Sequence, residues 1–360
     1  MRDTLSRKDD HIIYSLLPKS QFEVKTSWLE CVELVHMAVP ELDFEEVDMA
    51  VEFLGYRLNA PLMIAAMTGG TRLAKRLNSM FARAAEELGV AIGVGSQRVA
   101  LENPDVRDTF RVVRERASSV PVLANIGASQ VVEGLSEEKL GELIEMVGAD
   151  ALAVHLNPLQ EVLQVEGQPK YSGLLERLEE LVEISPVPII VKETGAGISR
   201  EAAEMVARAG VAGVDVGGAG GTSFARVEGL RALAEGDYML YRLSEDFAEW
   251  GIPTAASVLE VRTASDSLLV IATGGIRSGI DVAKAIRLGA DICGIAYPVL
   301  RAALQGGYTR VREYLRSVIE GLRRSAFLTG CGNVGELRSA PVVIRGALRE
   351  WIDYRGLKLP

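Results

Sequence analysis

The feature that most constrains the fold is an eightfold alternation of short apolar runs with segments of helical periodicity. The runs are rich in β-branched residues, end in glycine or polar residues, and begin at Pro61, Val90, Pro121, Ala151, Pro188, Gly213, Leu268 and Ala290. The segments between them, such as LAKRLNSMFARAAEELG, carry apolar residues at the spacing of a helix. The early runs follow one another at about 30 residues, which is the length of one βα unit.

Eight such units predict an α/β protein with a closed (β/α)8 TIM barrel. Parallel strands that are buried on both faces read as nearly continuous apolar runs, as these do. An open doubly wound sheet needs a point where the strand order reverses and usually has fewer repeats. In a barrel, functional residues lie where each strand ends and its loop begins.

The barrel period assigns most of the chain to one domain. We expect an N-terminal extension or cap over 1–59, the barrel over 60–325, and a C-terminal extension packed on the barrel over 326–360. The segment after the sixth strand, from Ala219 to roughly Tyr241, begins rich in glycine and is long enough to form a lid loop.

Charge and composition exclude several classes of function. The formal net charge is −10, which argues against binding to nucleic acid or membrane surfaces. No apolar run approaches the roughly 18–20 residues that span a bilayer, and charges stand where a signal peptide needs its apolar stretch. The three cysteines have no CxxC spacing, so neither a disulfide framework nor a zinc site is expected. A cytoplasmic protein is therefore predicted.

The sequence ATGGIRSG after the seventh strand is typical of a phosphate grip. Its glycines let backbone N–H groups approach an anion, and a helix is expected to begin at about Ser278. Barrels commonly bind phosphate after strands seven and eight, and the earlier run VGGAGGTS adds further N–H donors. A tight strand–helix turn that needs glycine is the alternative.

Polar side chains follow the other strands at the same end. Lys192 can face the N1–C2=O edge of a flavin, or it can pair with Glu193 or another barrel carboxylate. The densest polar patch is HLNPLQE, which runs from His155 to Glu161. Glu161 can serve as a ligand of Mg²⁺, which takes one or two carboxylates and substrate oxygens, or it can be a carboxylate at a helix start.

These motifs, in order, resemble the type 2 isopentenyl-diphosphate isomerases, which are FMN-dependent barrels. The resemblance covers nearly the whole chain, through SRKDDHI, PLMIAAMTGG, GVGSQR, ANIGA, HLNPLQE, VKETGAGIS, VDVGGAGGTSFARVE, GIPTAAS and ATGGIRSG. The succession of MTGG, GSQR, HLNPLQE and GGTSFARVE is specific, whereas GGIR alone indicates only a phosphate or FMN barrel.

The resemblance implies a residue-by-residue assignment. FMN would be bound by Ala66, Met67, Thr68, Ser96, Asn125, Lys192 and Thr222, with its phosphate on Gly274, Gly275, Ile276, Arg277, Ala296 and Tyr297. The substrate, an allylic or homoallylic diphosphate, would be bound by Arg7, Lys8, Ser96, Gln97, Arg98, His155, Asn157 and Gln160. Glu161 would bind Mg²⁺. Gly217 departs from the pattern, because many members carry serine there.

The implied reaction is the interconversion of isopentenyl and dimethylallyl diphosphate by a 1,3 shift of a proton and a double bond. Reduced FMN would act as the acid–base group, with NADPH as a reductant, while His155, Asn157 and Gln160 assist. Gln160 would orient or relay a proton. The family also implies a homotetramer or homo-octamer.

Two alternatives remain open. An FMN-dependent 2-hydroxy-acid oxidoreductase needs a histidine base at the late strands, but no histidine follows His155. An enzyme resembling inosine-monophosphate dehydrogenase is disfavoured, because it needs a nucleophilic cysteine after strand six and 219–262 contain none. A non-catalytic flavin- or phosphate-binding barrel does not need the polar patch HLNPLQE.

Overall fold

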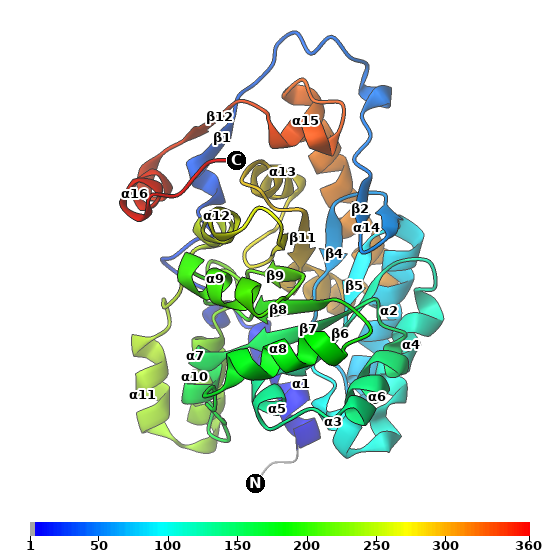
Figure 1. Cartoon of the computed structure of the whole chain (residues 1–360), viewed down its shortest axis with the longest axis vertical. Helices are drawn as coiled ribbons and strands as arrows, with labels where there is room; N and C mark the ends of the chain where they lie inside the picture. Colours follow the sequence, from blue (N-terminus) through cyan, green and yellow to red (C-terminus); the bar gives the residue numbers. More distant parts are fainter. Residues whose placement is uncertain (1–3) are drawn as a thin grey trace.

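The computed structural model describes residues 4–360, with side chains described from Lys8 onward, and eight parallel strands close into a barrel (Figure 1). Neighbouring strands follow chain order around the barrel, and the last pairs with the first. The strands are β4 (Leu62–Ile64), β5 (Ala91–Gly93), β6 (Val122–Gly127), β7 (Ala151–Leu156), β8 (Ile189–Glu193), β9 (Gly213–Asp215), β10 (Leu269–Ala272) and β11 (Ile292–Ile295). All eight predicted strands and the barrel are thereby confirmed.

Helices follow the strands and cover the outside of the barrel (Figure 1). They are α2 (Arg72–Leu88), α4 (Asp108–Arg116), α6 (Glu137–Val147), α8 (Leu174–Ile184), α9 (Arg200–Arg208), α12 (Thr254–Ala264), α13 (Gly279–Arg287) and α14 (Tyr297–Leu328). Local sequence sets their ends: the Thr71 hydroxyl accepts from Ala74 N at the start of α2, and Gly89 ends that helix in the left-handed conformation. Among the described residues, no helix is long and apolar enough to cross a bilayer.

The N-terminal extension contacts both ends of the barrel. Helix α1 (Thr4–Ser15) lies at the carboxyl ends of the strands, where Lys8 and His11 face a cavity. The hairpin of β2 (Val51–Phe53) and β3 (Tyr56–Leu58) closes the opposite end, where Phe53 and Leu58 pack against the interior of the barrel. The N-terminal extension, which was predicted as a cap, therefore covers both ends of the barrel.

Short elements connect this frame. They are α3 (Arg98–Glu102), α5 (Ala128–Val132), α7 (Pro158–Leu163), α10 (Phe224–Glu235), α11 (Tyr238–Asp246), α15 (Val334–Arg338) and α16 (Gly346–Arg355). Strand β1 (Val32–Leu34) pairs antiparallel with β12 (Val342–Ile344), so the two extensions are hydrogen-bonded to each other.

Two predicted boundaries differ from the structure. The segment from Ala219 to Tyr241 is a loop only as far as Ser223, after which α10 and α11 form. The prediction of a loop of that length is wrong, because α10 is an ordered helix with seven buried residues that packs against α1 and α7. The proposed barrel boundary at 325 falls inside α14, which runs on to Leu328 across a kink at Gly306 and Gly307.

Candidate active site

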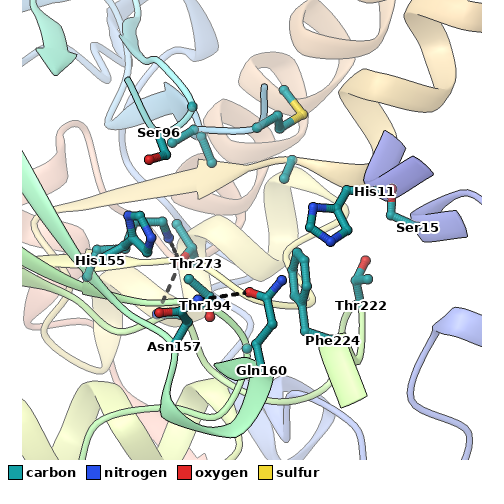
Figure 2. Close-up of a pocket in the computed structure, with 18 of the residues that line it drawn as sticks. His11, Ser15, Ser96, His155, Asn157, Gln160, Thr194, Thr222, Phe224 and Thr273 are labelled. Atoms are coloured by element: carbon teal, nitrogen blue, oxygen red, sulfur yellow. Dashed lines mark hydrogen bonds between the residues drawn. The ribbon is translucent and has the colours of Figure 1, made fainter. Parts of the chain in front are cut away.

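A cavity of about 330 Å³ lies at the carboxyl ends of the barrel strands, beneath α1. Figure 2 shows side chains from α1, β7 and the following loops turned toward it. Most of the predicted site residues line it: Lys8, Ala66, Met67, Thr68, Ser96, Arg98, Asn125, His155, Asn157, Gln160, Glu161, Lys192, Thr222, Gly274, Gly275, Ile276, Arg277, Ala296 and Tyr297. The side chain of Arg7 lies outside the described residues.

Gln97 is the predicted substrate residue that the structure places elsewhere. Its side chain is fully buried, and its amide nitrogen donates to the carbonyl oxygen of Leu143 on α6. Its side-chain oxygen accepts from the backbone N–H of Asn125 at 3.0 Å. Gln97 therefore ties β6 to α6, and its side chain does not line the cavity where the substrate was predicted to bind.

The glycine-rich turns after β9 and β10 pack directly on each other. Gly274 and Gly275 have φ of +101° and +72°, and a Cβ on Gly274 would lie 2.0 Å from the carbonyl oxygen of Gly218. Gly217 has φ +48°, and a Cβ there would lie 2.0 Å from the carbonyl oxygen of Glu193. This backbone requires glycine at 217, where the resemblance leads one to expect serine.

The predicted phosphate grip is only partly open. Helix α13 is closed by its own capping box, because one Asp281 carboxylate oxygen accepts from the backbone N–H groups of Arg277 and Ser278 at 3.0 and 2.9 Å. The backbone N–H groups of Arg277, Ser278 and Asp281 at the start of α13 are thus engaged. Helix α14 has no side-chain cap at Ala296, and Tyr297 and Pro298 at its start line the cavity. The start of α14 is therefore a helix end that faces the cavity without a side-chain cap.

Lys192 pairs with a barrel carboxylate, as one of its two sequence interpretations predicted. The carboxylate is Asp215, at 2.8 Å from the ammonium nitrogen, and not Glu193. Lys192 nevertheless lines the main cavity, while Asp215 is 2% exposed and lies beneath it. Elsewhere in the wall of the cavity, the Thr68 hydroxyl is buried and has no hydrogen-bond partner in the protein.

His155 is held in a defined orientation by Asn125. The Nδ1 atom of His155 lies 2.8 Å from the amide oxygen of Asn125, and this oxygen can only accept, so Nδ1 carries the hydrogen. Burial, followed by the charges of Lys192 and Lys8, lowers the pKa of His155 to about 4. The imidazole is therefore neutral at pH 7, with Nε2 as an acceptor.

A second polar cluster follows β7. The Asn157 amide nitrogen donates to Glu161 at 2.9 Å and to the Gln160 oxygen at 3.2 Å (Figure 2). The Tyr171 hydroxyl accepts from the backbone N–H of Asn157 at 3.0 Å, and burial raises the pKa of Tyr171 to about 12. The other Glu161 oxygen accepts from the backbone of Gln168. In the part of the chain that the structure describes, no three His, Cys, Asp or Glu side chains gather as a metal-binding group.

Sequence reasoning missed a buried carboxylate behind the wall of the cavity. Glu228 on α10 is 1% exposed and lies 2.8 Å from His11 Nε2, and it accepts from the Gln160 amide nitrogen at 2.7 Å. Arg231 binds its second oxygen. Burial alone would raise the pKa of Glu228, but the charge and hydrogen bond of His11, followed by Arg231 and Gln160, lower it. The available signal was a Glu–Arg pair three residues apart within a helix whose other residues are mostly small or apolar.

Comparison with known proteins places this site in a family. The FMN-dependent dehydrogenase family matches residues 114–344. Proteins named isopentenyl-diphosphate delta-isomerase are similar over nearly the full length: 48% identity in Pyrobaculum islandicum, covering 98% of each chain, and 47% in Archaeoglobus fulgidus, covering 98% of this chain and 99% of the other. This chain belongs to the isopentenyl-diphosphate delta-isomerase family. The relative in Methanopyrus kandleri is 46% identical, over 98% of this chain and 95% of its own.

Solved structures share the fold of this isopentenyl-diphosphate delta-isomerase family member. A mandelate oxidase superposes with a TM-score of 0.64 at 19% identity, covering 95% of this chain and 100% of the other. A lactate oxidase from Pediococcus acidilactici gives a TM-score of 0.67 at 14% identity, covering 96% of each chain. At such identity the likeness concerns the barrel and says nothing about the substrate.

Proposed function

We propose that this chain interconverts isopentenyl diphosphate and dimethylallyl diphosphate with FMN as its cofactor. The observation that carries the proposal is one cavity in which a glycine-lined cradle and cations meet, with His11 and Gln160 in its wall held by the buried Glu228 behind them. Near-full-length relatives named for this activity support the same reaction.

The residues of the cavity fit FMN. The unpartnered Thr68 hydroxyl needs a hydrogen-bond partner, which a polar edge of the flavin ring can supply. Gly274 and Gly275 bring backbone close to the cavity where a side chain could not stand, and Ala296 and Tyr297 begin an uncapped helix. When bound and reduced, FMN supplies an acid–base group for the alkene.

The diphosphate would be bound on the side of α1. Lys8, from α1, donates to the carbonyl oxygen of Ser96 at 2.7 Å, and Arg98 follows on α3. Both cations line the cavity, as does the acceptor-bearing imidazole of His155. An anion here would be attracted by these local charges although the whole chain is acidic.

Glu228 lies behind Gln160 and His11, which both line the cavity, and its lowered pKa keeps it a carboxylate that can orient these two side chains during the 1,3 shift. Gln160 donates to Glu228 and receives a hydrogen bond from Asn157, so the Gln160 amide is fixed between two neighbours. A glutamine does not titrate and therefore orients the alkene or relays a proton. Helix α1 covers the cavity and limits the access of water to the reacting carbons.

The resemblance supports further parts of this proposal. Glu161 would bind Mg²⁺ together with substrate oxygens, because it brings only one carboxylate to the cluster. NADPH would reduce FMN, the chain would assemble as a homotetramer or homo-octamer, and it would act in the cytoplasm. These four points stay predictions.

The test is turnover by the purified protein with photoreduced FMN, Mg²⁺ and isopentenyl diphosphate. We expect dimethylallyl diphosphate to form, and to be absent when FMN is left out. Oxidation of lactate or glycolate with no isomerase activity would favour the 2-hydroxy-acid oxidoreductase. Binding of FMN without either reaction would favour a non-catalytic flavin barrel.

A further inference from the structure

The Lys192–Asp215 pair joins two adjacent barrel strands beneath the cavity. Lys192 on β8 and Asp215 on β9 are direct partners in the strand register, and their charged atoms lie 2.8 Å apart. The side chain of Lys192 is 12% exposed and that of Asp215 is 2% exposed. Only Lys192 lines the main cavity, whereas Asp215 lines the small void below it.

Asp215 is fixed from its other side by Thr273, on the loop after β10. The Thr273 hydroxyl donates to Asp215 Oδ1 and accepts from the backbone N–H of Gly217 at 3.1 Å. Asp215 Oδ1 also accepts from the same Gly217 N–H at 3.3 Å. The carboxylate cannot turn away from Lys192 without losing these hydrogen bonds, so its negative charge is held in place under the lysine.

We propose that Asp215 is a positioning residue that tunes FMN through Lys192, and this inference rests on the proposed function. The carboxylate holds the ammonium group at the cavity floor and offsets much of its positive charge there. A flavin above Lys192 would therefore meet a dipole and not a bare cation. Asp215 itself touches neither cofactor nor substrate, because the lysine stands between it and the cavity.

The charge balance fixes the direction of the effect. An unpaired cation in a site of low dielectric strongly stabilises an adjacent anion. Reduced flavin becomes an anion when its N1 atom loses a proton, so an unpaired lysine beside the ring would stabilise the reduced, N1-deprotonated form. Pairing with Asp215 weakens that attraction. With Asp215 present, reduced FMN is therefore less stabilised than it would be by Lys192 alone, and the pKa of its N1 atom is higher.

The variant Asp215→Asn removes the charge while keeping the size and one acceptor for the Thr273 hydroxyl. We expect the ratio of affinities for reduced over oxidised FMN to rise about tenfold, which is about 30 mV in the two-electron potential. The N1 pKa of the reduced flavin, followed by absorbance, should fall. Lys192→Met should move both quantities in the opposite direction.

Two further variants distinguish the tuning of the flavin potential by Asp215 from a purely structural contribution of its carboxylate. In the Lys192→Met background, Asp215→Asn should shift the potential by much less than it does alone, because a carboxylate this deeply buried does not keep its charge without its cationic partner. Asp150→Asn removes a carboxylate that pairs with Arg114 at 2.6 Å at the other end of the barrel, and it should leave the potential unchanged. An unshifted potential in Asp215→Asn, or equal shifts with and without Lys192, would overturn the proposal.

The tuning role of Asp215 and the proposed function would be contradicted by different results. If the chain binds FMN and isomerises the diphosphate but Asp215→Asn leaves the potential unmoved, only the tuning role is wrong. If the wild-type chain binds no FMN, the proposed function itself fails. Should Asp215→Asn not fold, Thr273→Val tests the same contact more gently, and a smaller upward shift of the potential is expected.

Discussion

The two ends of the barrel are covered by parts of the same N-terminal extension, yet they differ in chemistry. At the amino ends of the strands, Phe53 and Leu58 of the β2–β3 hairpin fill an apolar cluster. At the carboxyl ends, α1 places Lys8 and His11 over a polar cavity. One end gains stability from burial, while the other holds charges in fixed positions, so substitutions at the two ends should affect different properties.

The largest effect is expected at the polar end, in Glu228→Gln. The change removes the buried negative charge shared by His11, Gln160 and Arg231 and replaces one acceptor oxygen with a donor, and turnover should fall by about 10²–10⁴-fold. Steady-state kinetics with reduced FMN measure it, and thermal unfolding checks that the fold remains. Glu235→Gln, on the exposed end of the same helix, is the matched control. Near-normal turnover in Glu228→Gln would remove this carboxylate from the mechanism.

At the apolar end, Phe53→Ala should lower stability and leave chemistry almost untouched. Phe53 is 2% exposed, and truncating a buried phenylalanine costs about 3–5 kcal/mol. Urea unfolding monitors the loss, and KM and kcat are measured below the new midpoint. A selective fall in kcat with unchanged stability would contradict the division of roles between the two ends.

Thr68→Val should separate stability from cofactor binding within the polar end. The Thr68 hydroxyl is buried without a partner, so a methyl group in its place should not destabilise the protein without FMN. Loss of one hydrogen bond should weaken FMN binding by about fivefold to tenfold, as measured by quenching of flavin fluorescence. Unchanged affinity would mean that this hydroxyl does not contact the flavin.

The smallest expected effect is a proton taken up when the diphosphate binds. Burial and nearby lysines lower the pKa of His155 to about 4, so the free site holds it neutral at pH 7. A diphosphate beside the ring raises that pKa, and His155 gains up to one proton. Calorimetry in buffers of different ionisation enthalpy reports the uptake. His155→Gln should lose it and the exposed His36→Gln should keep it; equal uptake in both would exclude His155.

The same linkage sets the sign of one contribution to stability. Because the folded pKa of His155 lies below the ordinary value of 6.5, the unfolded chain binds a proton more readily. Its neutral, buried form therefore favours folding above pH 6.5, and this contribution is lost as the pH falls toward 4. His155→Gln should flatten the acid limb of the stability curve over that range.

The sequence allowed the barrel and most of the cavity wall to be predicted because strand ends are visible locally. Apolar runs end at Thr68, Asn125 and Lys192, and the fold sends all such ends to one mouth. Orientation within a turn is less visible, so Gln97 was placed in the cavity although it points to α6. The Ser278–Asp281 capping box was readable as a motif, yet its consequence for phosphate was missed.

Contacts between distant segments could not be predicted in this way. His11 and Glu228 are 217 residues apart and meet because α10 packs on α1, where a loop was expected. The pairing of Lys192 with Asp215 depends on the register of β8 and β9, which apolar runs alone do not specify. Both contacts involve buried charges, whose partners only the tertiary structure defines.

The most direct test of the account is the fate of solvent hydrogen during turnover. The protein with photoreduced FMN and Mg²⁺ is equilibrated in D₂O, supplied with isopentenyl diphosphate and quenched early, and the product is analysed by NMR. A proton shift at the polar mouth predicts dimethylallyl diphosphate with one deuterium in the methyl group formed from the terminal alkene carbon. Dimethylallyl diphosphate without deuterium, or no product from FMN-loaded protein, would contradict it.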